Sequence, residues 1–330
     1  MIVKRRVFAA AVLVSMAGVV QALPPRNLSA AAEHSVARDE YSLLVWYKGR
    51  VIFERGPDCK NPAPRIYSIT KSLVSIGVFR NALSGGLSLG QPARFAGARG
   101  VTLEELLNQS SGLPPAHREF YSAGLRDKEA VLRRLKPNGE RGRFVYGPSH
   151  WEVLAEEINQ STLRPLDLWL KKFVPGAKRQ VVESWRRDDH GRLFFSTGAR
   201  MDARDLLPAA REVLRGLRDG RGCWPVEVRD MMASGTSANR MYALGFWLNR
   251  GAGQAGVREI DVETALGSPK SADFWRQGCL SLAAPAGMVA MIGSHGQRVY
   301  IVPSQDLVVI RLGAGRGFND AKFLRCLFGS

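Results

Sequence analysis

The alternation of hydrophobic and polar positions predicts paired strands at both ends of the chain. Residues 41–47 and 51–54 are two β-rich runs about Gly49, which predicts a hairpin. Near the C-terminus, residues 297–302 and 307–312 flank a Pro-Ser-Gln-Asp turn and predict a second hairpin. Strands from both ends of the chain indicate one antiparallel sheet that is closed by its termini.

The middle of the chain has helical patterns instead. Thr102-x-x-Glu105 and Ser149-x-x-Glu152 are two capping-box patterns, each of which predicts a helix start. Further helical patterns cover 168–173, 202–218 and 319–327; Pro208 is expected to kink or split the second of these, and the third should pack on the sheet.

These elements predict an α+β fold in one domain over 23–330. The α/β lobe, with the central antiparallel sheet, is expected from residues 35–80 and 235–330. An all-α lobe is expected over 81–234. The hydrophobic helix that begins near residue 68 should lie at the junction of the two lobes.

Ser68 and Lys71 are the first candidates for chemistry. Residues i and i+3 lie one turn apart on a helix, so the two side chains can touch. Residues 69–80 are apolar on almost every face, so this helix should be buried and the pKa of Lys71 should be lowered. A lysine of this kind activates a serine nucleophile, and the Ser68 amide at the helix start can form half of an oxyanion hole.

The N-terminus has the features of a secretory signal peptide. Lys4, Arg5 and Arg6 precede an apolar run over 7–20, and small residues end the pattern at Ala22. We expect cleavage after residue 22 and a periplasmic or secreted protein without stable membrane insertion; an uncleaved N-terminal anchor is the alternative.

The formal net charge of +17 raises the question of anionic partners. The lysines and arginines are spread along the chain and do not form a concentrated tail, so nucleic acid is not an expected partner. The basic surface is instead expected to contact anionic components of the cell envelope.

The four cysteines permit two disulfides in an exported chain, with three possible connectivities. We favour a pair between Cys279 and Cys326, which leaves Cys59 and Cys223. None of the four has C-x-x-C spacing, so metal binding is not expected.

Several ordered stretches together resemble the serine hydrolases related to class C β-lactamases, a family that includes penicillin-binding carboxypeptidases, esterases and nylon-oligomer amidases. The stretches are 67–73 (YSITKSL), 86–89 (GLSL), 101–113 (VTLEELLNQSSGL), 242–247 (YALGFW) and 293–311. The resemblance covers roughly 40–327. It implies a β-lactamase/transpeptidase-like fold, Ser68 as the nucleophile, Lys71 beside it, and no metal or organic cofactor.

Two motifs depart from the family pattern. Tyr146-Gly147-Pro148 has the tyrosine of the Tyr-x-Asn motif without its asparagine. Tyr146 is expected to have a lowered pKa and to act as general base toward Ser68. Met291-Ile292-Gly293 stands where β-lactamases have Lys-Thr-Gly, which argues against β-lactams and D-alanyl peptides as the evolved substrates.

The same alignment implies further site residues. The Ser294 amide would be the second oxyanion donor, and Gly293 and His295 would contact substrate. Trp151 and Tyr242 are expected at the pocket wall, although aromatic side chains more often lie in a core.

The resulting expectation is an exported esterase or amidase that acts on small molecules through a Ser68 acyl-enzyme. One alternative is a penicillin-binding D-alanyl carboxypeptidase or weak β-lactamase. A second is a non-catalytic envelope-binding protein, and binding of polyanions is the third.

Overall fold

The computed structural model describes residues 27–56, 63–95, 100–122, 125–137, 140–162, 165–219, 224–315 and 317–329. They form the α+β fold that the sequence predicts, around a seven-stranded antiparallel sheet in the order β2-β1-β9-β8-β7-β4-β3. The strands of this sheet are β1 (Glu40–Tyr47), β2 (Arg50–Arg55), β3 (Tyr242–Ala243), β4 (Phe246–Leu248), β7 (Val289–Gly293), β8 (Gln297–Val302) and β9 (Leu307–Gly313). A separate parallel pair consists of β5 (Arg258–Glu259) and β6 (Gly278–Cys279).

Both predicted hairpins are confirmed. Lys48 and Gly49 connect β1 to β2 with φ values of 43° and 95°. Two consecutive left-handed residues give the turn whose twist matches that of paired strands, and the glycine adopts its φ without a steric penalty. The other hairpin, β8 and β9, is connected through the short 3-10 helix η2 (Pro303–Gln305).

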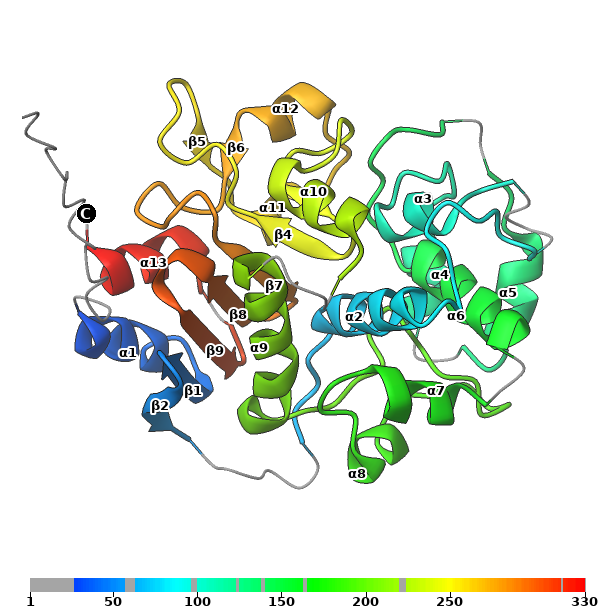
Figure 1. Ribbon diagram of the computed structural model, residues 1–330, viewed down its shortest axis with the longest axis horizontal. Helices are drawn as coiled ribbons and strands as arrows, with labels where there is room; N and C mark the ends of the chain where they lie inside the picture. Colours follow the sequence, from blue (N-terminus) through cyan, green and yellow to red (C-terminus); the bar gives the residue numbers. More distant parts are fainter. Residues whose placement is uncertain are drawn as a thin grey trace, which may run out of the picture.

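Helices cover both faces of the sheet (Figure 1). Leu44 and Trp46 of β1 belong to the core cluster that includes α9, whereas Leu43 and Val45 belong to the cluster under α1 and α13. Successive side chains of a strand point to opposite faces, so one hydrophobic run serves both layers. These helices are α1 (Leu28–Val36), α9 (Ala203–Asp219) and α13 (Asp320–Phe328).

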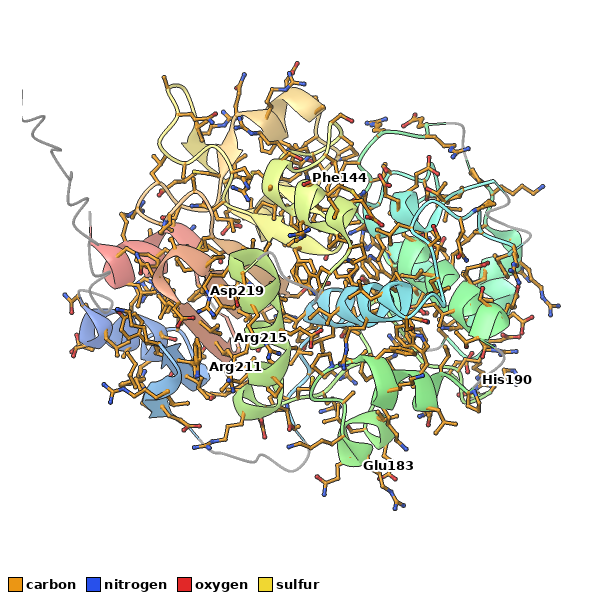
Figure 2. All side chains as sticks on the ribbon, viewed as in Figure 1. Phe144, Glu183, His190, Arg211, Arg215 and Asp219 are labelled. Carbon is orange, nitrogen blue, oxygen red and sulfur yellow. The ribbon has the colours of Figure 1, made fainter. Side chains whose placement is uncertain are left out.

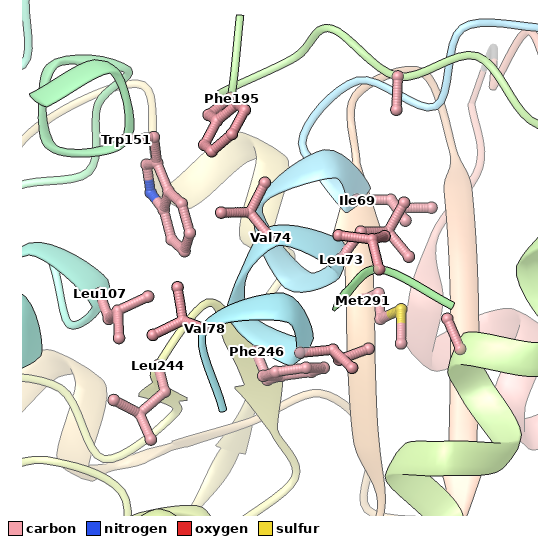
Figure 3. Close-up of a cluster of buried hydrophobic side chains, with 14 of the residues drawn as sticks. Ile69, Leu73, Val74, Val78, Leu107, Trp151, Phe195, Leu244, Phe246 and Met291 are labelled. Atoms are coloured by element: carbon pink, nitrogen blue, oxygen red, sulfur yellow. The ribbon is translucent and has the colours of Figure 1, made fainter. Parts of the chain in front are cut away.

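Helix α2 (Ile69–Leu83) lies between the sheet and the group of helices that follows α2 in the chain, before α9 (Figure 1). Its apolar residues point outward on several sides, toward Trp151 and Phe195 as well as toward Met291 of the sheet (Figure 3). The helix is therefore buried, as its sequence predicts. The helices beyond it are α3 (Leu103–Leu107), α4 (His117–Tyr121), α5 (Lys128–Arg134), α6 (Ser149–Thr162), α7 (Leu166–Phe173) and α8 (Arg179–Glu183); α10 (Val226–Ser234), α11 (Val262–Ala265) and α12 (Ala272–Arg276) follow α9.

Two local predictions have opposite outcomes. The capping box of Thr102 and Glu105 is present, with both reciprocal hydrogen bonds. The one at Ser149 is wrong: α6 already includes Ser149, whose hydroxyl donates to the carbonyl oxygen of Pro114, and Glu152 pairs with another helix. Ser149 and Glu152 therefore bond to residues outside their own helix and do not cap it.

Helix α9 differs from its prediction in two respects. It continues through Pro208 as one helix, so the expected split is absent although the proline cannot donate the hydrogen bond to the carbonyl oxygen four residues earlier. It also packs on β8 and β9 of the sheet, although it falls within the segment expected for the helical lobe.

The predicted pairing of Cys279 with Cys326 is wrong, because both are free thiols, one on β6 and one on α13. Cys59, Cys223 and the predicted signal peptide lie outside the described residues. Within the described ranges, every helix is too short or too polar to cross a lipid bilayer.

Candidate active site

Ser68 stands immediately before α2 with its hydroxyl free of any capping role. It occupies the N-cap position, where serine usually bonds to the helix backbone, yet its side chain makes no such bond. Lys71 Nζ lies 2.9 Å from Ser68 Oγ instead. The spacing of three residues therefore brings the predicted pair into direct contact, and Ser68 retains 8% of its surface accessible.

The Lys71 amine is enclosed by the protein. Burial lowers the pKa of Lys71 to about 7, and the negative charge of Glu152 only partly opposes this shift. The carbonyl oxygen of Ser196, 2.9 Å from Nζ, is a second hydrogen-bond acceptor and fixes the direction of the amine. Near neutral pH a large fraction of Lys71 is thus the neutral base, as the sequence predicts.

Tyr146 lies beside this pair, with its ring centroid 5.1 Å from Lys71 Nζ. Its side chain is hydrogen-bonded to Ser68, but burial outweighs this bond and raises the pKa of Tyr146 to about 12. The expectation of a lowered pKa for this phenol is therefore wrong. The low dielectric that makes Lys71 neutral also keeps Tyr146 protonated, because burial disfavours the charged form of either group.

His150 and Gln109 hold the segment that carries Tyr146. His150 bonds through one ring nitrogen to Ser111 and through the other to the carbonyl oxygen of Val145, at 2.8 and 2.9 Å. Gln109 accepts a hydrogen bond from the Gly147 amide at 2.7 Å. Sequence reasoning did not identify either residue, since both act through backbone groups that have no signature in the sequence.

Tyr242 and Trp151 were predicted to contact substrate, but the structure places both in the core. Tyr242 is 1% exposed and its hydroxyl accepts a 2.7 Å hydrogen bond from Gln109, beneath the Tyr146 ring. Trp151 is fully buried against α2 (Figure 3). Neither lines the cavity at Ser68, so we correct these two assignments: both aromatic rings support the site from behind.

A cavity of about 230 Å³ opens at Ser68. The lining of this cavity includes Ser294, which directly follows β7, together with Ser68 at the start of α2. Gly293 precedes it, and a Cβ atom at Gly293 would lie 2.3 Å from the Ile66 carbonyl oxygen. Glycine is required there for close approach of β7 to the chain before Ser68. The cavity is lined by Ser68, His117, Tyr121, Tyr146, Trp247, Val262, Glu263, Leu266, Gly267, Ile292 and Ser294.

Tyr67 and His295 flank the two serines and share an unusual backbone conformation. Their φ values are 47° and 62°, in the left-handed region that side chains other than glycine seldom adopt. Their rings contact each other, with centroids 4.9 Å apart. Such strained residues persist where the surroundings hold them, commonly at functional sites.

Glu263 and His117 are cavity residues that sequence reasoning missed. Glu263 accepts hydrogen bonds from the amides of His295 and Gly296 and pairs with Arg298 at 2.8 Å, so it holds the loop that carries Ser294. His117 lines the cavity from α4. A single glutamate and a single histidine, each on a short helix, gave no signal in the sequence. No group of three or more metal-ligating side chains was found among the residues described.

The family model described as Beta-lactamase matches residues 28–324. The chain belongs to the beta-lactamase family. This match spans the segments in which the sequence resembles the serine hydrolases related to class C β-lactamases, and the resemblance is thereby confirmed at the level of the family. No curated protein sequence shows significant similarity to this beta-lactamase-family protein.

Solved structures share its fold. EstCE1, a hydrolase with promiscuous acyltransferase activity, superposes with a TM-score of 0.61 at 16% identity over 90% or more of both chains (91% of this one and 98% of EstCE1). A class C beta lactamase from Rhodobacter sphaeroides gives 0.57 at 17% identity, over 90% and 96% of the two chains. A penicillin-binding protein homologue from Pyrococcus abyssi, which is octameric, gives 0.53 at 16% identity, over 90% and 74%. At such identities the likeness establishes the fold of this beta-lactamase-family protein and leaves its substrate open.

Proposed function

We propose that this protein is a serine hydrolase that cleaves an ester or amide through an acyl-enzyme on Ser68. The 2.9 Å contact between Lys71 Nζ and Ser68 Oγ carries the proposal, because the amine is buried and has a pKa of about 7. A neutral amine at this distance can accept the hydroxyl proton as the oxygen attacks.

In the first half-reaction, Ser68 Oγ bonds to the carbonyl carbon of the substrate while its proton passes to Lys71. The carbonyl π electrons move onto oxygen, and the backbone amides of Ser68 and Ser294 stabilise that negative charge. The tetrahedral intermediate then expels the alcohol or amine, which takes a proton from Lys71 through the Tyr146 hydroxyl. Tyr146 acts here as a neutral donor and acceptor, since its pKa of about 12 excludes a persistent phenolate at neutral pH.

In the second half-reaction, water attacks the acyl-enzyme and gives its proton to Lys71. The Ser68 oxygen leaves and is protonated, so the acid product is released and the enzyme returns to its starting state. Because the Ser196 carbonyl oxygen fixes Lys71 in both halves, one amine serves both steps.

An ester or small amide is favoured over a β-lactam as substrate. Met291 stands where the β-lactamase motif has a lysine, and it is fully buried in the sheet. This strand therefore offers no cation for a carboxylate beside the scissile bond. A D-alanyl carboxypeptidase or weak β-lactamase is the second candidate. The family match and the structural likeness to a class C beta lactamase support it.

The test compares Ser68→Ala with Ser304→Ala, a control at an exposed serine of η2. We expect Ser68→Ala to lose turnover of p-nitrophenyl esters and labelling by a fluorophosphonate, while the control retains both. Rapid hydrolysis of nitrocefin without ester turnover would support the second candidate. Absence of labelling by every acyl probe in the wild type would instead support a non-catalytic envelope-binding protein.

We also propose that residues 1–22 direct export to the periplasm or the medium. The pattern of positive residues followed by an apolar run supports this. Mass spectrometry of the protein recovered from a secreting host should find an N-terminus at residue 23, and an intact Met1 in that fraction would contradict cleavage.

A further inference from the structure

A second cavity, of about 520 Å³, adjoins the one that contains Ser68. Ser294 and Tyr121 line both cavities, so a single substrate can occupy the two at once. The larger cavity is rich in arginine, unlike the smaller one. Its lining consists of Arg65, Tyr67, Tyr121, Arg186, Arg187, Thr197, Gly198, Arg200, Ser294 and His295.

Backbone hydrogen bonds bring three of these arginines together from separate parts of the chain. Arg65 and Arg200 face each other in an antiparallel bridge. The Arg186 amide donates to the carbonyl oxygen of Gly198 at 2.9 Å, which joins the third arginine to the same segment. A Cβ atom at Gly198 would lie 2.1 Å from Trp185 Nε1, so the close approach requires glycine. The cluster is therefore built into the fold.

The charges of this cluster are not balanced by the protein. Arg187 pairs with Asp167 at 2.8 Å, but in the described part of the chain Arg65, Arg186 and Arg200 have no carboxylate within ion-pair distance. Arg200 donates to a backbone carbonyl oxygen, and Arg186 lies 3.9 Å from the ring centroid of Phe194. These contacts orient the guanidinium groups without neutralising them.

The charge of Arg65 acts on the other two arginines. Burial lowers the pKa of Arg186 and of Arg200; the charge of Glu152 partly opposes this at Arg186, and the positive charge of Arg65 lowers the pKa of both further. Like charges held together in a partly enclosed cavity raise the free energy of the unliganded protein. An anion that enters the cavity removes this repulsion.

We propose that the arginine cluster of Arg65, Arg186 and Arg200 binds a carboxylate of the substrate, so that the preferred ester or amide is anionic at a position remote from the scissile carbonyl. The inference rests on the proposed function of Ser68 and adds the substrate class. A guanidinium group matches a carboxylate through two parallel hydrogen bonds, and Thr197 offers a hydroxyl in the same cavity. The arginines thus provide the positive charge that the lysine of the β-lactamase motif would provide, but from the larger cavity and not from strand β7, where Met291 stands.

The experiment uses two matched esters, mono-p-nitrophenyl glutarate and its neutral methyl ester. We expect the wild type to have a KM roughly tenfold lower for the anionic ester at similar kcat, the scale of one charge-assisted pair. Arg65→Gln should remove this difference by raising the KM of the anionic ester roughly tenfold. Arg65 is exposed, so its substitution should not disturb folding. Arg215→Gln is the control, because it removes the same charge on α9 at the molecular surface (Figure 2).

A binding measurement tests the cluster independently of catalysis. Glutarate should bind to the Ser68→Ala protein in calorimetry, and Arg65→Gln or Arg200→Gln should weaken it roughly tenfold. Equal KM values for the two esters, or glutarate binding unchanged by both substitutions, would overturn the inference. Inorganic phosphate that binds more tightly than glutarate would overturn the choice of carboxylate. Failure of the proposed function looks different: both esters would be hydrolysed equally by wild type and Ser68→Ala.

Discussion

Glu152 of α6 and Lys128 of α5 form a 2.8 Å ion pair in the interior, where their side chains are 0% and 2% exposed. The other carboxylate oxygen of Glu152 accepts a 2.9 Å hydrogen bond from the Ser196 amide. The carbonyl oxygen of the same residue, Ser196, receives a hydrogen bond from Lys71. Through one residue, the buried ion pair thus determines where the proposed base points.

Replacing Glu152 with Gln should affect stability and activity together. Loss of one partner leaves Lys128 buried and unpaired, so the free energy of unfolding should fall by about 3–5 kcal/mol in urea titrations. Because the charge of Glu152 raises the pKa of Lys71, its removal should also move the acidic limb of kcat/KM to lower pH. Glu156→Gln, one turn later on α6, is the control. An unchanged unfolding midpoint for Glu152→Gln would contradict a role for the ion pair.

The pH dependence of hydrolysis should report on Lys71. Protonated Lys71 cannot accept the Ser68 proton, and its pKa is about 7. We therefore expect kcat/KM for a neutral ester to decrease tenfold per pH unit below this value, roughly a hundredfold at about pH 5. A flat profile between about pH 5 and 8, measured where the protein remains folded, would exclude Lys71 as the base.

Lys71→Met should stabilise the protein while it abolishes activity. In the unfolded chain Lys71 has its ordinary pKa of 10.5, so between pH 7 and 10.5 the unfolded state binds the proton and the folded state does not. This difference destabilises the folded wild type below pH 10.5 and makes its stability rise with pH through that window. Removing the amine should therefore raise the free energy of unfolding by about 1–3 kcal/mol at pH 7, with a smaller gain near pH 10. Thermal or urea unfolding of both proteins across this range measures the difference; a less stable variant at pH 7 would show that the hydrogen bonds of Lys71 outweigh its burial.

Tyr146→Phe separates the roles of the phenol and the amine. If Tyr146 relays a proton as a neutral group, its loss should lower kcat by about 10²–10⁴-fold, the usual range for such catalysis. The acidic limb should stay near pH 7, because that limb belongs to Lys71. Stopped assays over a pH series with a p-nitrophenyl ester give both quantities. Disappearance of the limb in the variant would instead make Tyr146 the titrating base.

Local patterns predicted the parts of the site that are local. The i, i+3 spacing of Ser68 and Lys71 and the burial of their helix are sufficient to place the two groups in contact. The lowered pKa of Lys71 follows from the same burial, but the opposite shift of Tyr146 required knowing that its phenol is buried as well. The family motif identified Tyr146 as a site residue but did not indicate that its phenol is buried.

Distant contacts account for what was missed. Glu152 was interpreted as part of a capping box, whereas its carboxylate bonds to residues 24 and 44 positions away in the chain. Trp151 and Tyr242 were assigned to the pocket from their residue type, although only packing decides which face of an aromatic ring meets a cavity. The arginine cluster likewise forms from residues that are far apart in the sequence.

The place of β9 in the sheet has a consequence for synthesis of the protein. This strand lies between β1, near the start of the chain, and β8, so the inner edge of each neighbour stays unpaired until residues 307–313 have left the ribosome. Pairing across such a sequence separation is a slow step in folding. A chain that terminates before β9 loses the middle of its sheet and exposes two hydrophobic edges, which makes it prone to aggregation.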